Sequence, residues 1–558
     1  MIKKLTTLLC FLMCCFVLKA QNTIGLLTYN QNKAFDGYNL LYQHNQPSVF
    51  LLDNCGEIVH KWEGEPGTRP ANTAYLLEDG RLVKTVRPAS IAGDRIWAGG
   101  GGATVEIRDW DNNLEWSYTL NDSTARLHHD IAVVEKNNKV TIAMVAWEIK
   151  TLEEVLQAGK DTSVLTQGEM WPDYILEIDP ATDEIIWEWH AWDHLVQDFD
   201  DTKDNFGVIA DNPTKIDINH DLDGIGKADW MHVNALDYNA QNDYFIMSVP
   251  NFSEVWVIDH STTTEQAQQS FGGLSNLGGD LMYRWGNPQI YDQGDSTDQR
   301  LFFQHDVNFI DDYISESDPN YGKIAVFNNR IASDFSTANV FDAGFDDYMW
   351  NFPFENGKFG PDDVEQTFTH PVDPTLLFST GLSSIQYLPN SNYLITSGRF
   401  GYTFELTPDN EIVWEYKTPQ NGTAPATQGD TLQVNNNLTF RVKRIPPDFP
   451  AFDGRDLTPK GWIELEPDTS YCDELTFTEE LITEYGLEVF PNPATNMITL
   501  KWDAGKYINV QVIDMLGRPM IENMTINGGR KYIDTSAWET GIYIVRINER
   551  EAGKFLKI

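Results

Sequence analysis

Histidines in three similar contexts are the residues of this sequence best suited to chemistry. Only 11 histidines occur in 558 residues, and three β-like segments begin with them: Leu127-His-His-Asp130, Asp229-Trp-Met-His-Val-Asn234 and Phe303-Gln-His-Asp306. A histidine nitrogen can act as a nucleophile, or as an acid or base near neutral pH. A single His-Asp pair more often closes a turn by hydrogen bonding. Three such motifs in succession favour a functional site.

Several other kinds of site are not supported. The glycine run at 99–102 leads into a strand-like segment rather than a helix, and no Gly-Lys-Ser/Thr follows it. We therefore interpret the run as a flexible turn and not as a phosphate cradle. The Gly-x-Ser-x-Gly motif of serine hydrolases is also missing.

One acidic loop, residues 217–224, has the alternating oxygens of a calcium site. The candidate ligands are Asp217, Asn219, Asp221 and Asp223, and Gly224 follows them. Such a loop is typical of extracellular calcium sites, although no bidentate glutamate stands at its far end. The alternative is a solvated acidic loop in a very acidic protein. Calcium binding at these four residues is a hypothesis.

The elements that must position these residues are β-strands. Apart from a helical pattern at 152–159, the chain is a series of short β-branched and aromatic runs separated by Asp, Asn, Gly and Pro. An apolar strand, a polar turn and a second strand with tryptophan recur about every 65 residues, with one longer interval. These repeats end at Trp62, Trp116, Trp187 and Trp414, and weaker versions at Trp285 and Trp350.

Six such repeats predict an all-β fold, a six-bladed β-propeller over residues 21–464. The innermost strand of each blade lines the central channel, so equivalent positions of different blades converge on one pocket. Histidines that begin successive strands would meet there. The alternative is that tryptophan is simply common, since 17 occur in the chain.

The ends of the chain predict export. Lys3 and Lys4 precede an apolar run at 5–18 and a small residue at Ala20, the layout of a secretory signal peptide over residues 1–20. No later stretch is apolar enough for a transmembrane segment. The formal net charge of −43 argues against a nucleic-acid partner. An acidic linker at 465–486 precedes a C-terminal module at 487–558.

Two cysteines, Cys55 and Cys472, remain after removal of the signal peptide. Cys55 belongs to the first blade and Cys472 follows the last, and closure of a propeller ring brings these ends together. In an oxidising compartment we therefore predict a disulfide between them.

The C-terminal module resembles the type IX secretion sorting domain. Its opening, Val489-Phe-Pro-Asn-Pro-Ala-Thr-Asn496, and its strand Gly541-Ile-Tyr-Ile-Val-Arg546 are the specific signature. The resemblance implies a small β-sandwich that the type IX secretion machinery reads. It predicts a secreted or cell-surface protein that is exported through the periplasm.

Most of residues 50–460 resembles the arylsulfotransferase family. The resemblance rests on the order of several motifs: Asp229-Trp-Met-His-Val-Asn234, Gln304-His-Asp306, Val326-Phe-Asn-Asn-Arg330, Ser384-Ile-Gln-Tyr-Leu-Pro-Asn390 and the segment ending at Trp414. It implies a six-bladed propeller that transfers a sulfuryl group from a phenolic sulfate donor to a phenol acceptor and requires no cofactor. It places His232, His305 and Arg330 in the channel. The candidate substrate-binding residues are Asn234, Asn328, Asn329 and Arg399.

The sequence departs from this family at one position. The histidine that carries the sulfuryl group in the family comes late, after the arginine, whereas this chain has no histidine beyond His370. Two interpretations follow. Either His370, His305 or His129 serves as the nucleophile, or the chain is a non-catalytic surface propeller for ligand binding or adhesion.

Overall fold

The computed structural model describes residues 22–136, 139–221 and 226–472, and most of 487–557. The C-terminal part is described at 487–490, 494–502, 508–514, 518–526, 529–539, 541–547 and 550–557. The predicted signal peptide, Asp223 and most of the predicted linker lie outside these ranges. Within them, no helix is long and apolar enough to cross a membrane.

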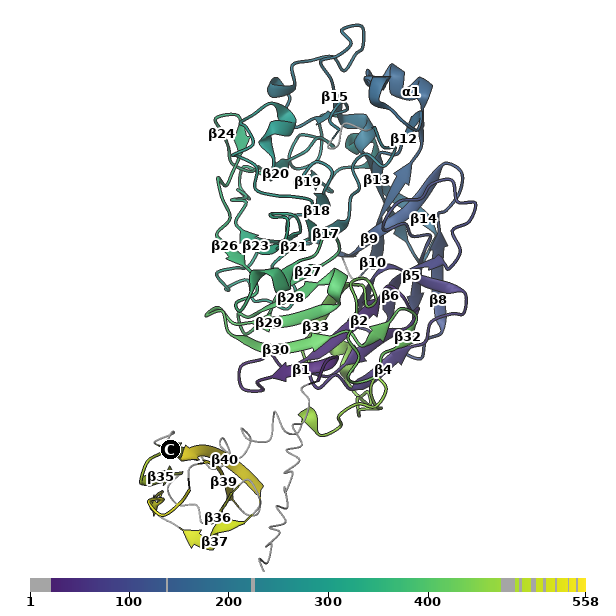
Figure 1. Cartoon of the computed structure of the whole chain (residues 1–558). Coiled ribbons are helices and arrows are strands. Elements are labelled where there is room, and N and C mark those ends of the chain that lie inside the picture. The colour runs from purple at the N-terminus through teal and green to yellow at the C-terminus, as the bar shows by residue number, and fades with distance from the viewer. Residues whose placement is uncertain are drawn as a thin grey trace, which may run out of the picture.

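Six antiparallel sheets form the large domain (Figure 1). The first sheet consists of β33 (Thr439–Ile445), β2 (Tyr38–Gln43), β3 (Val49–Leu52) and β4 (Ile58–Trp62). The second consists of β5 (Thr68–Leu76), β6 (Leu82–Pro88), β7 (Thr104–Arg108) and β8 (Leu114–Thr119). The third consists of β9 (Ala125–Lys136), β10 (Lys139–Glu148), β13 (Asp173–Asp179) and β14 (Glu184–His190).

Three more sheets follow in chain order. The fourth consists of β17 (Ala235–Asn239), β18 (Tyr244–Val249), β19 (Glu254–Asp259) and β20 (Tyr283–Trp285). The fifth consists of β21 (His305–Phe309), β22 (Ile324–Asn328), β23 (Thr337–Phe341) and β26 (Gln366–Phe368). The sixth consists of β27 (Ser384–Tyr387), β28 (Tyr393–Ser397), β29 (Tyr402–Leu406), β30 (Ile412–Lys417) and β1 (Gly25–Tyr29). The helical pattern at 152–159 forms α1 (Leu152–Gln157).

The inner strands of the six sheets form a closed ring. Each contacts the inner strand of the next sheet, in the order β33, β5, β9, β17, β21, β27 and back to β33. A ring of sheets around an axis, each with one edge strand innermost, is a β-propeller. The predicted all-β propeller is confirmed. The number of six blades stays a prediction, with which the six sheets are consistent.

The two ends of the large domain close the ring twice. The C-terminal strand β33 pairs with β2 in the first sheet, and the N-terminal strand β1 pairs with β30 in the sixth. Cys55 and Cys472 form a disulfide next to these junctions, with 5.5 Å between their Cα atoms. The Tyr471 hydroxyl donates to the Leu27 carbonyl oxygen at 2.7 Å.

Breaking this disulfide is expected to destabilise the large domain. The cross-link closes a loop of 417 residues, and removing a native disulfide costs about 2–4 kcal/mol of the free energy of unfolding. The measurement is urea unfolding of the wild type and of Cys55→Ser, with a non-reducing peptide map of the exported protein. Two unlinked thiols in that map, or equal stability of the two proteins, would show that no disulfide between Cys55 and Cys472 stabilises the domain.

The repeated tryptophans join neighbouring sheets. Each side chain lies on the fourth strand of its sheet, and its indole N–H donates to the next sheet around the ring. Four of the five indoles are buried and need an acceptor, whereas Trp116 is only half-buried. The five bonds are Trp62 to the Asp109 carbonyl oxygen, Trp116 to Asp183, Trp187 to Thr262, Trp285 to the Pro361 carbonyl oxygen and Trp414 to the Asn54 carbonyl oxygen, at 2.7–3.2 Å. The repeat in the sequence therefore marks contacts between sheets.

Trp350 does not belong to this series. It lies in the long excursion between β23 and β26, outside any strand. The fourth strand of the fifth sheet is β26, which carries Phe368 and no tryptophan. The prediction of a repeat ending at Trp350 is wrong, because the excursion supplies a tryptophan at a similar spacing by chance.

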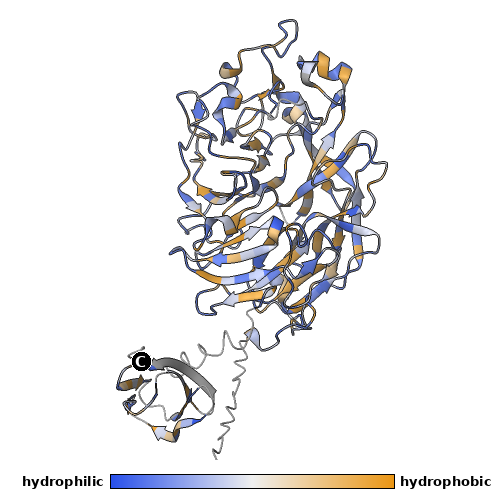
Figure 2. Cartoon of the chain, viewed as in Figure 1, coloured by the Kyte–Doolittle hydropathy of each residue, from blue (hydrophilic) through white to orange (hydrophobic). Residues whose placement is uncertain are grey.

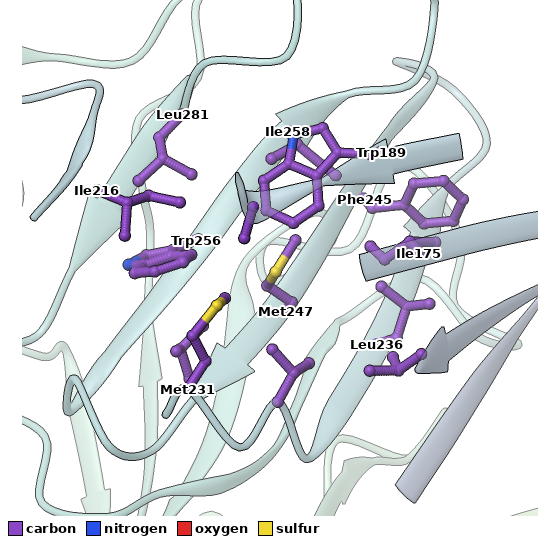
Figure 3. Packing of buried hydrophobic residues seen from close by; sticks show 14 of the residues in the cluster. Ile175, Trp189, Ile216, Met231, Leu236, Phe245, Met247, Trp256, Ile258 and Leu281 are labelled. Atoms are coloured by element: carbon purple, nitrogen blue, oxygen red, sulfur yellow. The ribbon is translucent and has the colours of Figure 1, made fainter. Parts of the chain in front are cut away.

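Apolar side chains fill the spaces between the sheets. Strands with apolar residues run through the whole domain in Figure 2. Figure 3 shows one such space, in which Ile175 of the third sheet lies near Phe245 of the fourth, and Trp256 of the fourth sheet lies near Ile216. Phe245 and Trp256 are fully buried. Strands β18 and β19 are buried along their whole length, so both of their faces are covered.

A buried histidine also links the third and fourth sheets. His260 contacts Glu177 through Nε2 and Asp243 through Nδ1, both at 2.7 Å. Burial alone lowers the pKa of His260, but the two carboxylates outweigh it and raise the pKa to about 9. The protonated histidine is therefore part of the folded structure at neutral pH.

Alkaline pH is expected to weaken this link. Because the folded-state pKa of His260 lies above its ordinary value of 6.5, its contribution is complete below about pH 6.5 and is lost as the pH rises through about 9. The loss is about 3 kcal/mol, from 1.36 kcal/mol per pKa unit. The measurement compares urea unfolding of wild type and His260→Gln between neutral and alkaline pH. An identical pH dependence of the two proteins would rule out this assignment.

The C-terminal part contains two further sheets. One consists of β34 (Glu488–Phe490), β35 (Met497–Lys501) and β38 (Arg530–Asp534). The other consists of β37 (Pro519–Ile526), β36 (Ile508–Asp514), β39 (Gly541–Ile547) and β40 (Arg550–Lys557). Ile498, Leu500, Val510 and Val545 are fully buried in a core of their own. This is the small β domain that the sequence predicts.

Candidate active site

Histidines and arginines meet at one end of the central channel. His129 lies near the start of β9, His232 three residues before β17, and His305 opens β21. Arg330 follows β22, and Arg399 lies in the short helix η6 (Gly398–Phe400). We call these five residues the histidine mouth. They come from the third, fourth, fifth and sixth sheets: the histidines lie near the starts of inner strands, and the arginines follow the second strands β22 and β28 (Tyr393–Ser397).

Ring contacts connect the members of the histidine mouth. The rings of His129 and His232 have centroids 4.6 Å apart. Phe303 lies 6.3 Å from His232 and 6.1 Å from His305, and the Arg330 guanidinium lies 3.6 Å from the Phe303 ring centroid. Arg399 lies close enough to His305 that its charge helps to lower the pKa of that histidine.

His305 is held as a neutral imidazole with a defined tautomer. Its Nδ1 lies 2.8 Å from Oδ1 of Asn329. The amide of Asn329 is fixed, because its Nδ2 donates to the carbonyl oxygens of Ser379 and Leu382, both at 2.9 Å. An amide oxygen can only accept, so Nδ1 of His305 carries the proton and Nε2 carries the lone pair. Burial lowers the pKa of His305 to about 3, which keeps the ring neutral.

His232 has the opposite electrostatic setting. Its Nδ1 lies 2.6 Å from Oδ2 of Asp229. Burial by itself lowers the pKa of His232, but the charges of Asp229 and Asp173 outweigh burial, so the pKa is raised. The site therefore pairs a neutral histidine with one that favours protonation, and such divided pairs carry acid and nucleophile roles in enzymes.

The arginines make this end of the channel attractive to anions. Arg330 donates through Nε to the Thr380 carbonyl oxygen at 3.1 Å, and Arg399 donates through Nη1 to Asn435 Oδ1 at 3.1 Å. Nε of Arg399 is buried and has no hydrogen-bond partner among the residues that the structure describes. His44 lies nearby, since burial and the charges of Arg87 and Arg399 lower its pKa to about 4. Positive charge in a chain of −43 focuses anions on this mouth.

The other predicted asparagines serve the framework. Asn234 donates to the Gln304 carbonyl oxygen at 2.8 Å and so ties β17 to β21. Asn328 donates to the Arg300 carbonyl oxygen and accepts from the Phe302 amide, both at 2.8 Å. Both polar atoms of the Asn328 side-chain amide therefore bond to the segment that leads into β21. Asn329 is the asparagine of this group that contacts a histidine.

The glycine run at 99–102 packs against the histidines and is not simply a flexible turn. The Gly100 carbonyl oxygen accepts from the His129 amide at 2.8 Å. Gly100 has a φ of +76°, and a Cβ there would lie 2.0 Å from His129 Nε2. Only glycine leaves space beside that nitrogen. The sequence analysis missed this role, although four glycines between two apolar strands were a signal of close approach.

His370 lies apart from the histidine mouth. Its Nε2 lies 3.2 Å from the Tyr402 hydroxyl, and its ring packs on Phe404 with centroids 5.4 Å apart. Both partners belong to β29, the third strand of the sixth sheet. The segment before β27 carries Gly381 beside His305 and Arg399. The structure thus groups His129 and His305, and not His370, with His232.

In the predicted calcium loop, one carboxylate oxygen of Asp217 and one of Asp221 accept backbone N–H groups. Asp217 accepts from the Asn219 amide, and Asp221 from the Gly226 amide, at 2.8 and 2.6 Å. The buried Lys160 ammonium donates to the Ile218 carbonyl oxygen at 2.8 Å. Among residues with described positions, no three His, Cys, Asp or Glu side chains form a metal site. Asp223 lies outside those positions.

A buried ionic network closes the channel below the histidines. Arg441 of β33 contacts Asp306 at 2.5 Å and Asp130 at 2.9 Å, and it also donates to the Tyr75 hydroxyl. The four residues come from four different sheets. Beyond them lies a cavity of about 680 Å³, whose lining includes the carboxylates of Asp237, Asp311 and Asp312. The two ends of the channel therefore differ in charge.

The fold and the site define a β-propeller protein with histidines and arginines gathered at one end of its central channel. The chain belongs to the arylsulfotransferase family, because the family model Arylsulfotransferase (ASST) matches residues 26–435. The model of the secretion system C-terminal sorting domain matches residues 488–558. The chain is therefore exported by type IX secretion to the cell surface or the extracellular space.

Comparison with curated proteins found no match. Solved structures match at low identity. A protein of unknown function from Bacteroides caccae is 10% identical, with a TM-score of 0.34 over 68% of this chain and 94% of that one. A putative 6-phosphogluconolactonase from Bacteroides fragilis is 10% identical, with a TM-score of 0.33 over 75% and 99%. A streptogramin B lyase is 11% identical, with a TM-score of 0.34 over 77% and 96%. Scores this low carry no argument about function.

Proposed function

We propose that this protein transfers a sulfuryl group from a phenolic sulfate ester to a phenol, with His305 as the nucleophile. The observation that carries the proposal is the fixed Asn329 amide, which accepts from Nδ1 of His305 and leaves the lone pair on Nε2. A neutral imidazole with an oriented tautomer is the form that attacks. Membership of the arylsulfotransferase family supports the reaction class.

The reaction divides into two displacements at sulfur. Nε2 of His305 attacks the sulfur of the donor, the bond from sulfur to the phenolic oxygen breaks, and the phenolate leaves with the electron pair. The acceptor phenol loses its proton and attacks the sulfur of the sulfated histidine, and the electron pair of the nitrogen–sulfur bond returns to Nε2. No other reactant is needed, because the proton lost by the acceptor balances the one taken by the donor phenolate.

The neighbouring side chains have matching roles. The arginine guanidinium groups of Arg330 and Arg399 are suited to the non-bridging sulfate oxygens, whose negative charge increases in the transition state. His232, whose pKa is raised, is suited to protonate the departing phenolate. The arginines that bind the sulfate and the histidine that donates the proton therefore lie on different sheets around the histidine mouth.

The test is turnover of 4-nitrophenyl sulfate by the purified protein with and without a phenol acceptor. We expect release of 4-nitrophenol that depends on the acceptor, and a sulfated acceptor in equal amount. If 4-nitrophenyl sulfate binds but no sulfated phenol forms with any acceptor, the transfer proposal fails and the non-catalytic binding propeller is the better interpretation.

A further inference from the structure

Three arginines around the histidine mouth have no carboxylate partner. Arg69 is the second residue of β5, Arg87 lies near the end of β6, and Arg399 belongs to the histidine mouth itself. Among the residues that the structure describes, none of these three forms an ion pair, whereas Arg126 of β9 pairs with Asp94. Acidic side chains outnumber Lys and Arg in this chain by 83 to 40. Unpaired arginines in such an acidic protein indicate an anionic partner from outside.

Arg69 and Arg87 repel each other. They stand directly opposite in the antiparallel pair of β5 and β6, so their side chains leave the same face of the sheet, where like charges are destabilising. Burial and the charge of Arg69 lower the pKa of Arg87, as this repulsion requires. Both side chains are only partly buried, so a ligand can reach them from solvent. An anion bound by both guanidinium groups would relieve the repulsion.

The Trp97 ring holds Arg87 in place. The guanidinium carbons of Arg87 and Arg126 lie 5.2 and 4.7 Å from the centroid of this ring. Arg126 is fixed in turn, because it donates to the carbonyl oxygens of Gly102 and Ile96 at 2.8 and 3.0 Å. A cation–π contact orients a guanidinium group without neutralising its charge. Arg87 is therefore oriented, and its charge remains available.

The glycine run joins this arginine pair to the histidines. A Cβ at Gly101 would lie 2.8 Å from the Trp97 ring, and a Cβ at Gly100 would lie 2.0 Å from Nε2 of His129. Trp97, which contacts Arg87, and His129 therefore pack against neighbouring glycines of one loop. The arginine pair lies beside the histidine mouth, separated from it by this loop.

His44 completes the group from the first sheet. It follows β2, and its Nε2 is buried with no hydrogen-bond partner in the described part of the chain. Burial and the charges of Arg87 and Arg399 lower the pKa of His44 to about 4, so the ring is neutral and lies within the field of both arginines. A neutral imidazole can donate one N–H to an anionic oxygen. We call Arg69, Arg87 and His44 the arginine patch.

We propose that the acceptor phenol carries a second anionic group, such as a carboxylate, and that the arginine patch binds it. This inference rests on the proposed function, in which Arg330 and Arg399 serve the sulfuryl group. Guanidinium forks match the paired oxygens of a carboxylate. Binding energy from a remote group of this kind orients the reacting hydroxyl. The substrate class is therefore an anionic phenol and not a neutral one.

Acceptor charge tests the inference. The acceptors 3-(4-hydroxyphenyl)propanoate and its amide have the same shape and differ in charge. With 4-nitrophenyl sulfate as donor, we expect kcat/KM of the wild type to be about 10- to 100-fold higher for the acid, as a charge-assisted hydrogen bond provides. Arg69→Gln and Arg87→Gln should reduce this ratio towards one. Neither variant leaves a carboxylate without its ion pair, so both should fold.

Arg81→Gln is the matched control, since Arg81 lies at the other end of the β5–β6 pair and pairs with Asp79 at 2.7 Å. It should keep the full preference for the acid. If the wild type used the acid and the amide equally well, the inference would be wrong, although sulfuryl transfer itself would stand.

Binding without a donor separates this inference from the proposed function. In calorimetry we expect the acid to bind about 10-fold or more tightly than the amide, a difference that Arg87→Gln loses and Arg81→Gln keeps. That result would support the arginine patch even in a protein without transferase activity. Inorganic sulfate that binds as tightly as the acid, and with the same dependence on Arg87, would show recognition of a free anion and overturn the inference.

Discussion

Replacing His305 by alanine is expected to reduce sulfuryl transfer about 1000-fold or more, because removal of a nucleophile that acts with its neighbours eliminates the covalent route. Arg330→Ala is expected to cost about 100-fold, as the loss of one charge-stabilising donor does. Rates of transfer from 4-nitrophenyl sulfate to a phenol, at saturating acceptor, measure both.

His370→Ala is the matched control for His305→Ala. His370 is also buried, but it contacts Tyr402 and Phe404 instead of the histidine mouth. We expect its turnover to equal that of the wild type. If His370→Ala lost most of its activity while His305→Ala kept full activity, our assignment of His305 as the nucleophile would be wrong.

Replacing Arg441 by alanine is expected to lower the free energy of unfolding by about 3–5 kcal/mol, the cost of leaving buried charges without their partner. Asp130 and Asp306 have side chains exposed by only 0% and 2%, so removing the guanidinium leaves two buried carboxylates without this ion pair. Urea unfolding followed by tryptophan fluorescence measures the change.

The control for Arg441→Ala is Lys33→Ala. Lys33 pairs with Glu411 at 2.6 Å, but the two side chains are 50% and 49% exposed, and exposed pairs contribute about 0–1 kcal/mol. A destabilisation of Arg441→Ala as small as that of Lys33→Ala would show that the network does not hold the inner strands together.

The all-β propeller could be predicted because five of the six sheets carry the tryptophan repeat on their fourth strand. Alternating apolar segments predicted strands, and the tryptophans marked fourth strands because their indoles must bond to the next sheet. The prediction for Trp350 was wrong because composition and spacing cannot show whether an indole N–H has an acceptor on the next sheet. The fourth strand of the fifth sheet lacks tryptophan and could not be found by that signal.

The candidate site was predictable only in part. The histidines that begin inner strands could be grouped, because the ends of these strands converge around the channel axis. The roles of Asn328 and Asn329 could not be separated. Adjacent side chains at a strand end point in different directions, and the sequence does not show which of the two faces His305. The contact of Gly100 with His129 and the ammonium of Lys160 beside the acidic loop depend on segments that are distant in sequence. No local pattern records such contacts.

The most direct test of the central claim is the site of sulfation. The protein is mixed with 4-nitrophenyl sulfate without acceptor, quenched at alkaline pH to preserve a nitrogen–sulfur bond, digested and analysed by mass spectrometry. We predict one sulfuryl group on the peptide that contains His305, its transfer when a phenol is added, and its absence in His305→Ala. Sulfation of another histidine, or transfer to the phenol with no sulfated peptide at any time, would contradict the claim.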